Sequence, residues 1–152
     1  MATKVIFPNE AERLFLKHSL GVGGIAPFQE LRLFVNDIPI LNGTVLGSFT
    51  EAAGGGYSAK AVNRSRWVFQ IISQIARANQ SGLEFSTTLQ FDFTGPLNSN
   101  DTIFGWFLVA MFDDLVTASG VLAAKRLNTP FQPVNPGDKL NIGNMLLEIK
   151  QG

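Results

Sequence analysis

The pattern of apolar and polar residues changes along the chain, from one helical segment near the start to short extended runs after residue 26. The clearest run contains Leu89, Phe91 and Phe93, which alternate with polar residues as in a half-buried strand. Further extended runs are ELRLFVN, TVLGSF, RWVFQIISQIA, TIFGWFLVAMF, VLAAKRL and KLNIGNMLLEI. With turn residues between them, these runs predict seven or eight short strands in an all-β, antiparallel β-sandwich.

One short N-terminal helix is also predicted. Asn9 is its expected N-cap, with Glu12 at the spacing of a capping box, and Gly21 is a natural stop. Its buried face is expected to contain Ala11, Leu14, Phe15 and His18. The chain therefore divides into an N-terminal arm and helix, residues 1–25, and a β-sandwich, residues 26–152, within a single domain.

Two details of this prediction concern single segments. Asp113-Asp114 and Gly120 are expected to bracket a turn before the run VLAAKRL. The segment IISQIARANQ leaves a second helix open as an alternative to a strand, because its apolar residues also fit one helical face. Those residues are Ile71, Ile72, Ile75 and Ala78.

Charge is scarce and balanced in this chain. Charged residues make up 16% of the sequence, against about 25% in ordinary domains, and 12 basic residues balance 12 acidic ones. We therefore expect no attraction to nucleic acid or to an anionic membrane, and a surface weakly protected against self-association. The longest apolar run, residues 102–112, is too short for a membrane helix, and no signal peptide is visible. These features predict a soluble protein made in the cytoplasm that belongs to an assembly.

Residues suited to catalysis or metal binding are few. The chain has no cysteine, and His18 is its only histidine, at a position where we expect packing or capping. Most carboxylates lie at predicted turns, and Asp113-Asp114 lacks the spaced ligands of a calcium loop. Arg64 and Arg66 beside Trp67 are weak evidence for nucleic-acid binding in a neutral chain. We predict no catalytic residue, metal site or cofactor.

The glycine triplet Gly54, Gly55, Gly56 suggests a phosphate cradle but lacks the features of one. A P-loop requires Lys directly after its last glycine and a helix next, whereas Tyr57 and extended sequence follow here. The triplet is therefore interpreted as a tightly turned loop that Tyr57 anchors on apolar surface.

The segment Val5, Ile6, Phe7 places three apolar residues in an arm ahead of the helix. Such residues need cover, since burying each side chain is worth roughly 1.5–3 kcal/mol. Either the arm docks on a neighbouring subunit, or it pairs as an edge strand within its own subunit. Together with Gly54–Tyr57, these residues form the candidate partner interface.

Several sequence segments, taken in their order along the chain, resemble a family of small structural proteins of tailed bacteriophages. They are LRLFVND, GSFTEA with the Gly-Gly-Gly-Tyr loop, Trp67, IFGWFLV and VLAAKRLNTPFQPVNPGDKLNI. The resemblance covers roughly residues 30 to 150. Lys125 departs from it, because an acidic residue is expected there. The resemblance implies a jelly-roll-like sandwich and a virion protein that decorates (cements) the capsid or belongs to the tail.

The leading hypothesis is a non-enzymatic capsid decoration protein on the capsid surface, synthesised in the host cytoplasm. Its expected partners are the major capsid protein and itself, as a homotrimer, with no nucleic acid and no membrane. A tail- or fibre-associated subunit is the first alternative. A carbohydrate-binding sandwich is the second, because Trp67, Trp106 and Tyr57 could stack on sugars, although both tryptophans fit core positions better.

Overall fold

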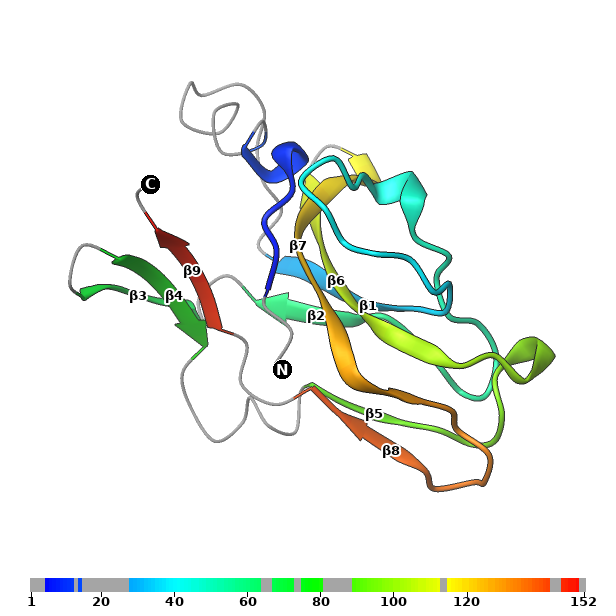
Figure 1. Ribbon diagram of the computed structural model, residues 1–152. Helices are drawn as coiled ribbons and strands as arrows, with labels where there is room; N and C mark the ends of the chain where they lie inside the picture. Colours follow the sequence, from blue (N-terminus) through cyan, green and yellow to red (C-terminus); the bar gives the residue numbers. More distant parts are fainter. Residues whose placement is uncertain are drawn as a thin grey trace.

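The described part of the protein consists of antiparallel β-sheets and one short N-terminal helix, as a computed structural model shows (Figure 1). The structure describes residues 5–12, 14, 28–63, 67–72, 75–80, 89–112, 115–142 and 146–150. Its strands are β1 (Phe28–Phe34), β2 (Lys60–Asn63), β3 (Trp67–Ile72), β4 (Ile75–Gln80), β5 (Gln90–Asp92), β6 (Ile103–Phe112), β7 (Leu115–Phe131), β8 (Lys139–Asn141) and β9 (Leu146–Lys150). Two short 3₁₀ turns, η1 (Leu46–Ser48) and η3 (Asn98–Asn100), lie in the connections.

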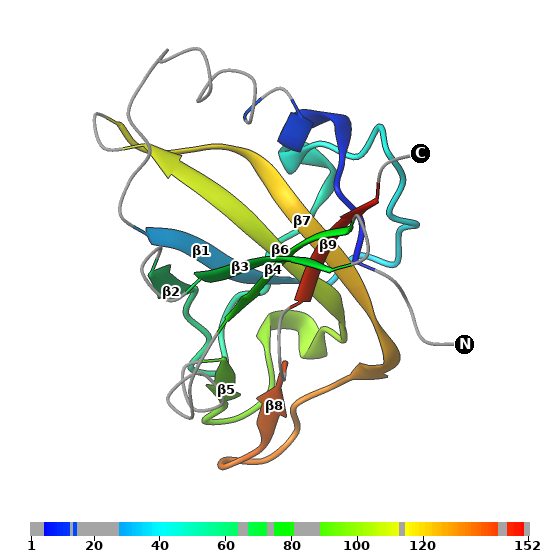
Figure 2. The ribbon, with the colours of Figure 1, turned by 90° about the vertical axis from the view of Figure 1, so that its left-hand side faces the viewer.

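The strands form three antiparallel sheets. The largest has the order β2-β1-β6-β7, and the smaller ones have the orders β3-β4-β9 and β5-β8. Figure 2, which looks from the left-hand side of Figure 1, shows β3, β4 and β9 in front of the four-stranded sheet. The predicted all-β architecture with one short helix is therefore confirmed.

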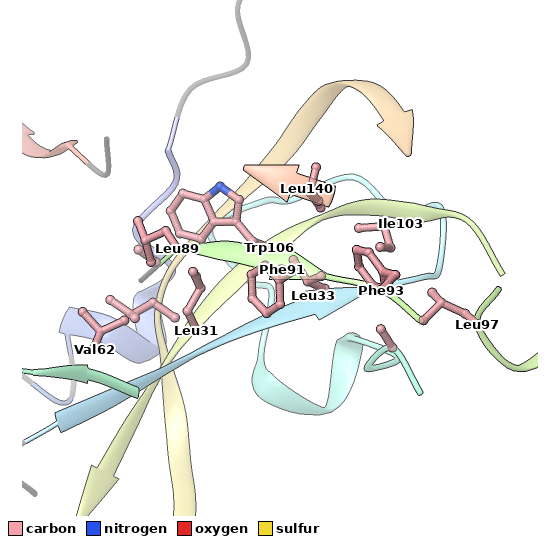
Figure 3. Packing of buried hydrophobic residues seen from close by; sticks show 13 residues of the cluster. Leu31, Leu33, Val62, Leu89, Phe91, Phe93, Leu97, Ile103, Trp106 and Leu140 are labelled. Atoms are coloured by element: carbon pink, nitrogen blue, oxygen red, sulfur yellow. The ribbon is translucent and has the colours of Figure 1, made fainter. Parts of the chain in front are cut away.

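One face of the four-stranded sheet packs against the two-stranded sheet. Alternate residues of a strand point to opposite faces, so Leu31 and Leu33 share one face of β1. They meet Phe91 of β5 and Leu140 of β8 in a cluster that also contains Trp106 (Figure 3). Leu89, Phe91 and Phe93 are all buried while Gln90 and Asp92 between them are not, which confirms the alternation expected from the sequence.

The opposite face of the same sheet is covered by the connection between β1 and η1 and by the residues that follow η1. Phe34 and Phe107 point to this side, and Phe49 stacks on Phe107 with ring centroids 4.5 Å apart. Arg126 of β7 holds the start of the connection, because its guanidinium donates to the Ile38 carbonyl and to the Asp37 carboxylate, both at 2.5 Å. The sheet is thus buried on both sides.

The N-terminal helix begins at Asn9, one residue earlier than a capping Asn9 would require, and residues 10–12 and 14 are also helical. Ala11 and Leu14 are buried, as expected for its inner face, whereas Phe15, His18 and Gly21 lie outside the described residues. The Glu10 carboxylate accepts the Leu46 N–H at 3.1 Å and the Val121 N–H at 2.9 Å. One side chain of the helix therefore holds both η1 and β7.

Three local predictions were wrong. TVLGSF contains the 3₁₀ turn η1 instead of a strand, because Leu46 and Phe49 turn inward to cover Phe34 and Phe107. Gly120 lies inside β7 and not at a turn, and a Cβ there would come within 2.9 Å of the Glu10 side chain. The run KLNIGNMLLEI is divided between β8 and β9, which pair with different strands.

The structure decides between a strand and a helix for the segment around Ile75, which the sequence had left open. Residues 67–72 and 75–80 form the antiparallel pair β3 and β4, with Ile72 opposite Ile75, and β4 also pairs with β9. A helix over this segment is therefore excluded. The described residues include nine strands where seven or eight were expected, because two of the expected runs each divide into two strands and β2 was not expected.

Candidate functional site

The glycine loop, residues 53–59, leaves and rejoins the edge of β1. Before the loop, the Ala52 N–H donates to the Leu33 carbonyl at 2.9 Å. After it, Lys60 begins β2 opposite Leu31. Seven residues thus bulge out of an otherwise continuous pairing along β1, and the loop needs backbone conformations that return the chain to the same edge.

All three glycines of the triplet have positive φ: Gly54 +80°, Gly55 +57° and Gly56 +78°. Residues with a side chain rarely adopt a positive φ. Neighbouring atoms also lie too close to accommodate a Cβ atom at each of the three positions. At Gly55 a Cβ would lie 2.6 Å from the carbonyl oxygen of Gly95, and at Gly56 it would lie 2.9 Å from the Thr94 hydroxyl. The triplet is therefore required by backbone geometry and by close packing against the connection between β5 and β6.

Tyr57, which follows the glycine triplet, anchors the loop on the core. Its ring stacks on Phe91 with centroids 5.8 Å apart, and its hydroxyl accepts the Leu33 N–H at 3.1 Å. The same hydroxyl donates to Glu51 Oε1 at 2.9 Å. Burial, the largest cause, raises the pKa of Tyr57 well above its ordinary value of about 10, and the nearby Glu51 charge acts in the same direction.

Arg32 joins this tyrosine to two carboxylates. Its Nη2 lies 2.6 Å from Glu30 Oε2 and its Nη1 lies 3.1 Å from Glu51 Oε2. Burial opposes the charge of Arg32, but the hydrogen bond to Glu30 and the charges of Glu51 and Glu30 raise its pKa above the ordinary value. The four side chains form one network of hydrogen bonds and ion pairs that holds the loop in place.

The N-terminal arm lies on its own chain. Ile6 and Ala124 exchange two backbone hydrogen bonds, of 2.8 Å and 3.0 Å, which make an antiparallel bridge to β7. Val5 and Phe7 are half-buried and pack against the main core. This arrangement is the within-subunit alternative for Val5–Phe7, and a contact of these residues with a partner stays a prediction.

The remaining candidates are only in part within the described residues. Trp106 is buried in the core and Tyr57 is half-buried, so neither presents an open ring face for stacking on a sugar. His18, Arg64, Arg66 and the Asp113-Asp114 pair lie outside the described residues, as does the Trp67 side chain. Within the described part of the chain, no three His, Asp or Glu side chains gather as a metal-binding group. No helix among these residues is long and apolar enough to cross a membrane.

Comparisons of the chain with protein-family models, with curated proteins and with solved structures found no match.

Sequence reasoning missed two features of this region. The ion pair between Arg32 and Glu51 joins residues far apart in the chain, and no local spacing signals it. The second feature is the contact between the glycine loop and the connection between β5 and β6, where Gly54 forms an isolated bridge to Leu97. Gly95-Pro96 is a second glycine-containing turn in the sequence, and it could have suggested two loops that pack closely.

Proposed function

We propose that this protein is a non-enzymatic structural protein of a tailed-bacteriophage virion, and specifically a decoration (cement) protein that binds the major capsid protein lattice. The observation that carries the proposal is the resemblance of the sequence segments between Leu31 and Ile142, in their order along the chain, to that family. The fold that belongs to this proposal is a jelly-roll-like β-sandwich, and the observed antiparallel β-sheets are consistent with it.

The geometry of the glycine loop supports a structural role. The features that first suggested phosphate binding serve the fold, because the triplet packs closely against the connection between β5 and β6. Tyr57, the polar group at its end, is bound to Leu33 and Glu51. A loop fixed in this way suits a protein whose task is to present a stable surface.

A homotrimer would suit binding to a repeating lattice. Three linked copies engage several sites at once, and effective concentration then adds about 10²–10⁴-fold to the strength of individually weak contacts. The scarcity of charge also favours association with other protein surfaces. The interface predicted at Val5–Phe7 and Gly54–Tyr57 belongs to this proposal.

The test is the number of copies in purified virions of the phage that encodes the chain, measured by quantitative mass spectrometry. Hundreds of copies per particle, lost together with capsid stability when the gene is deleted, would support decoration. A few or a dozen copies would place the protein in the tail instead. Absence from the particle would refute a virion role.

A further inference from the structure

We propose that Asn42-Gly43 is a site of self-modification, where Asn42 converts with time into aspartate and isoaspartate and thereby loosens the N-terminal helix. The pair lies in the connection between β1 and η1. Asn42 is the only asparagine of the chain that precedes a glycine. The reaction consumes only water and needs no partner, so it does not depend on the proposed virion role.

The chemistry is an attack by a backbone nitrogen on the neighbouring side chain. The Gly43 nitrogen gives its proton to a solvent base and forms a bond to Cγ of Asn42. The C–N bond of the side-chain amide then breaks, and the leaving nitrogen takes up a proton and departs as ammonia. Water next opens the cyclic imide. Cleavage at the Cγ carbonyl gives aspartate, whereas cleavage at the main-chain carbonyl gives isoaspartate.

The local structure leaves both reacting groups free. The Thr44 N–H donates to the Leu41 carbonyl at 3.0 Å, so Asn42 and Gly43 are the two central residues of an exposed β-turn. Among the described residues, neither the Gly43 N–H nor the side-chain amide of Asn42 has a hydrogen-bond partner. Gly43 also has no Cβ that would hinder the approach of its nitrogen to Cγ. The turn therefore presents the nitrogen and the amide side by side in solvent.

Asn36, on the same connection, has the opposite arrangement. Its Nδ2 donates to the Ser48 carbonyl at 2.8 Å, and its Oδ1 accepts the Thr50 N–H at 2.8 Å. Both ends of this amide are thus fixed, and the residue that follows it carries a side chain. Asn98 is exposed, but the next residue again carries a side chain. These two asparagines are internal references for the reactivity of Asn42.

The reaction would take place where the N-terminal helix is attached. The Asn9 N–H donates to the Asn42 carbonyl at 2.8 Å, and the Glu10 carboxylate accepts the Leu46 N–H at 3.1 Å. In Figure 1 this connection, drawn in cyan, passes beside the blue helix. Isoaspartate carries the main chain through the former side chain, so the turn gains a carbon atom. The group that Asn9 binds then no longer belongs to the backbone that positions it, and the attachment of the helix weakens.

Gly43→Ala is the matched variant for the modification itself. Gly43 has no positive φ, and a Cβ there meets nothing within 4 Å, so alanine fits the fold while its methyl group hinders the attack. We would incubate full-length wild type and Gly43→Ala in mildly alkaline buffer and locate aspartate and isoaspartate by peptide mass spectrometry. Equal melting temperatures of the fresh proteins would establish that both are folded.

We expect wild type to lose Asn42 before Asn36 and Asn98. Gly43→Ala should slow the loss of Asn42 at least about 10-fold, which corresponds to about 1.4 kcal/mol in the activation barrier. If Asn36 or Asn98 is lost first, or if Asn42 is lost equally fast in both proteins, the modification site is refuted.

Hydrogen exchange tests the loosening of the helix. The Asn9 and Leu46 amides should exchange faster in aged than in fresh wild type, because their hydrogen bonds open more often. Fresh Asn42→Asp adds the charge without the extra carbon atom, and it should exchange like fresh wild type. Unchanged exchange at both amides after conversion of Asn42 would overturn the loosening. Faster exchange in fresh Asn42→Asp would assign the effect to charge and refute the role of isoaspartate.

Discussion

At the scale of single residues, Tyr57 makes a contribution to stability that depends on pH. It is the only tyrosine in the chain, so its ionisation can be followed by itself. Its pKa is raised in the folded protein, so the unfolded chain ionises first as the pH rises. The stability that Tyr57 contributes is fully present below its unfolded pKa of about 10 and is lost as the pH rises toward the folded value. We expect the ultraviolet absorbance of the phenolate to appear only as the protein unfolds.

Tyr57→Phe is the matched variant. It removes the acceptor of the Leu33 N–H and should lower the free energy of unfolding at neutral pH by about 1–3 kcal/mol. The difference in the free energy of unfolding between wild type and variant should become smaller above about pH 10. A phenolate that titrates at its ordinary pKa in the folded protein would contradict the buried position of Tyr57.

The glycine triplet gives a second prediction at this scale. Gly55→Ala should lower the free energy of unfolding by more than about 2 kcal/mol, because it combines positive φ with a backbone clash at Gly95. Gly47→Ala is the control, since a Cβ there meets nothing within 4 Å. Denaturant unfolding of both variants would measure the difference. Equal stability of Gly55→Ala and wild type would show that the loop relaxes freely.

At the scale of elements, the helix and the arm are each fixed to the sheet by a few groups. Glu10→Ala removes the acceptor of the Leu46 and Val121 N–H groups, so the free energy of unfolding should fall by about 2–4 kcal/mol. Glu12→Ala on the same helix changes an exposed side chain and should cost less than about 0.5 kcal/mol. Thermal and urea unfolding would compare the two variants, and equal losses would contradict the role of Glu10.

Deleting residues 1–7 tests the arm. Loss of the two Ile6–Ala124 hydrogen bonds and of the Val5 and Phe7 contacts should lower the melting temperature measurably, with a loss of about 2–4 kcal/mol. Binding of the truncated protein to empty capsid shells, measured below its melting temperature, separates this stabilising role from docking on a neighbour. A truncated protein that melts like the full-length one and binds equally well would show that the arm plays no part in either.

Elements could be predicted from the sequence where a local pattern decided them. The strand around Phe91 is such a case, because the alternation of Leu89, Phe91 and Phe93 determines which side chains are buried. TVLGSF has a similar apolar content, yet its shape depends on Phe107, which is distant in the chain and stacks on Phe49. Gly120 reads as a turn residue locally, whereas its role is to leave room for Glu10.

The candidate site was predictable to a similar extent. The sequence indicated that Gly54–Gly56 serve backbone geometry and that Tyr57 anchors the loop, and both are seen in the structure. What could not be predicted is the surface that the loop joins, because its neighbours Thr94 and Gly95 follow it only after the four strands β2 to β5. Contacts between distant segments leave no periodic trace in the sequence.

At the scale of the whole molecule, the balance of charge governs behaviour in solution. The chain carries 12 basic and 12 acidic residues, so mutual repulsion between molecules is weakest near pH 7. We expect the solubility of the purified protein, measured by precipitation with polyethylene glycol, to be lower at pH 7 than at about pH 5 or about pH 9. Higher solubility at pH 7 than at both flanking values would contradict this expectation.

The pairing of the strands also sets how fast the chain can fold. β1 pairs with β6, β4 with β9 and β5 with β8, so each of these pairs must close a long stretch of intervening chain before its hydrogen bonds form. Only neighbours such as β3 with β4 and β6 with β7 can form as local hairpins. Because folding rates fall as contacts become less local, we expect this protein to fold in about milliseconds to seconds, with the hairpins first. Until β6 and β9 arrive, β1 and β4 expose strand edges on which partly folded copies can join, so refolding at low protein concentration should give the higher yield.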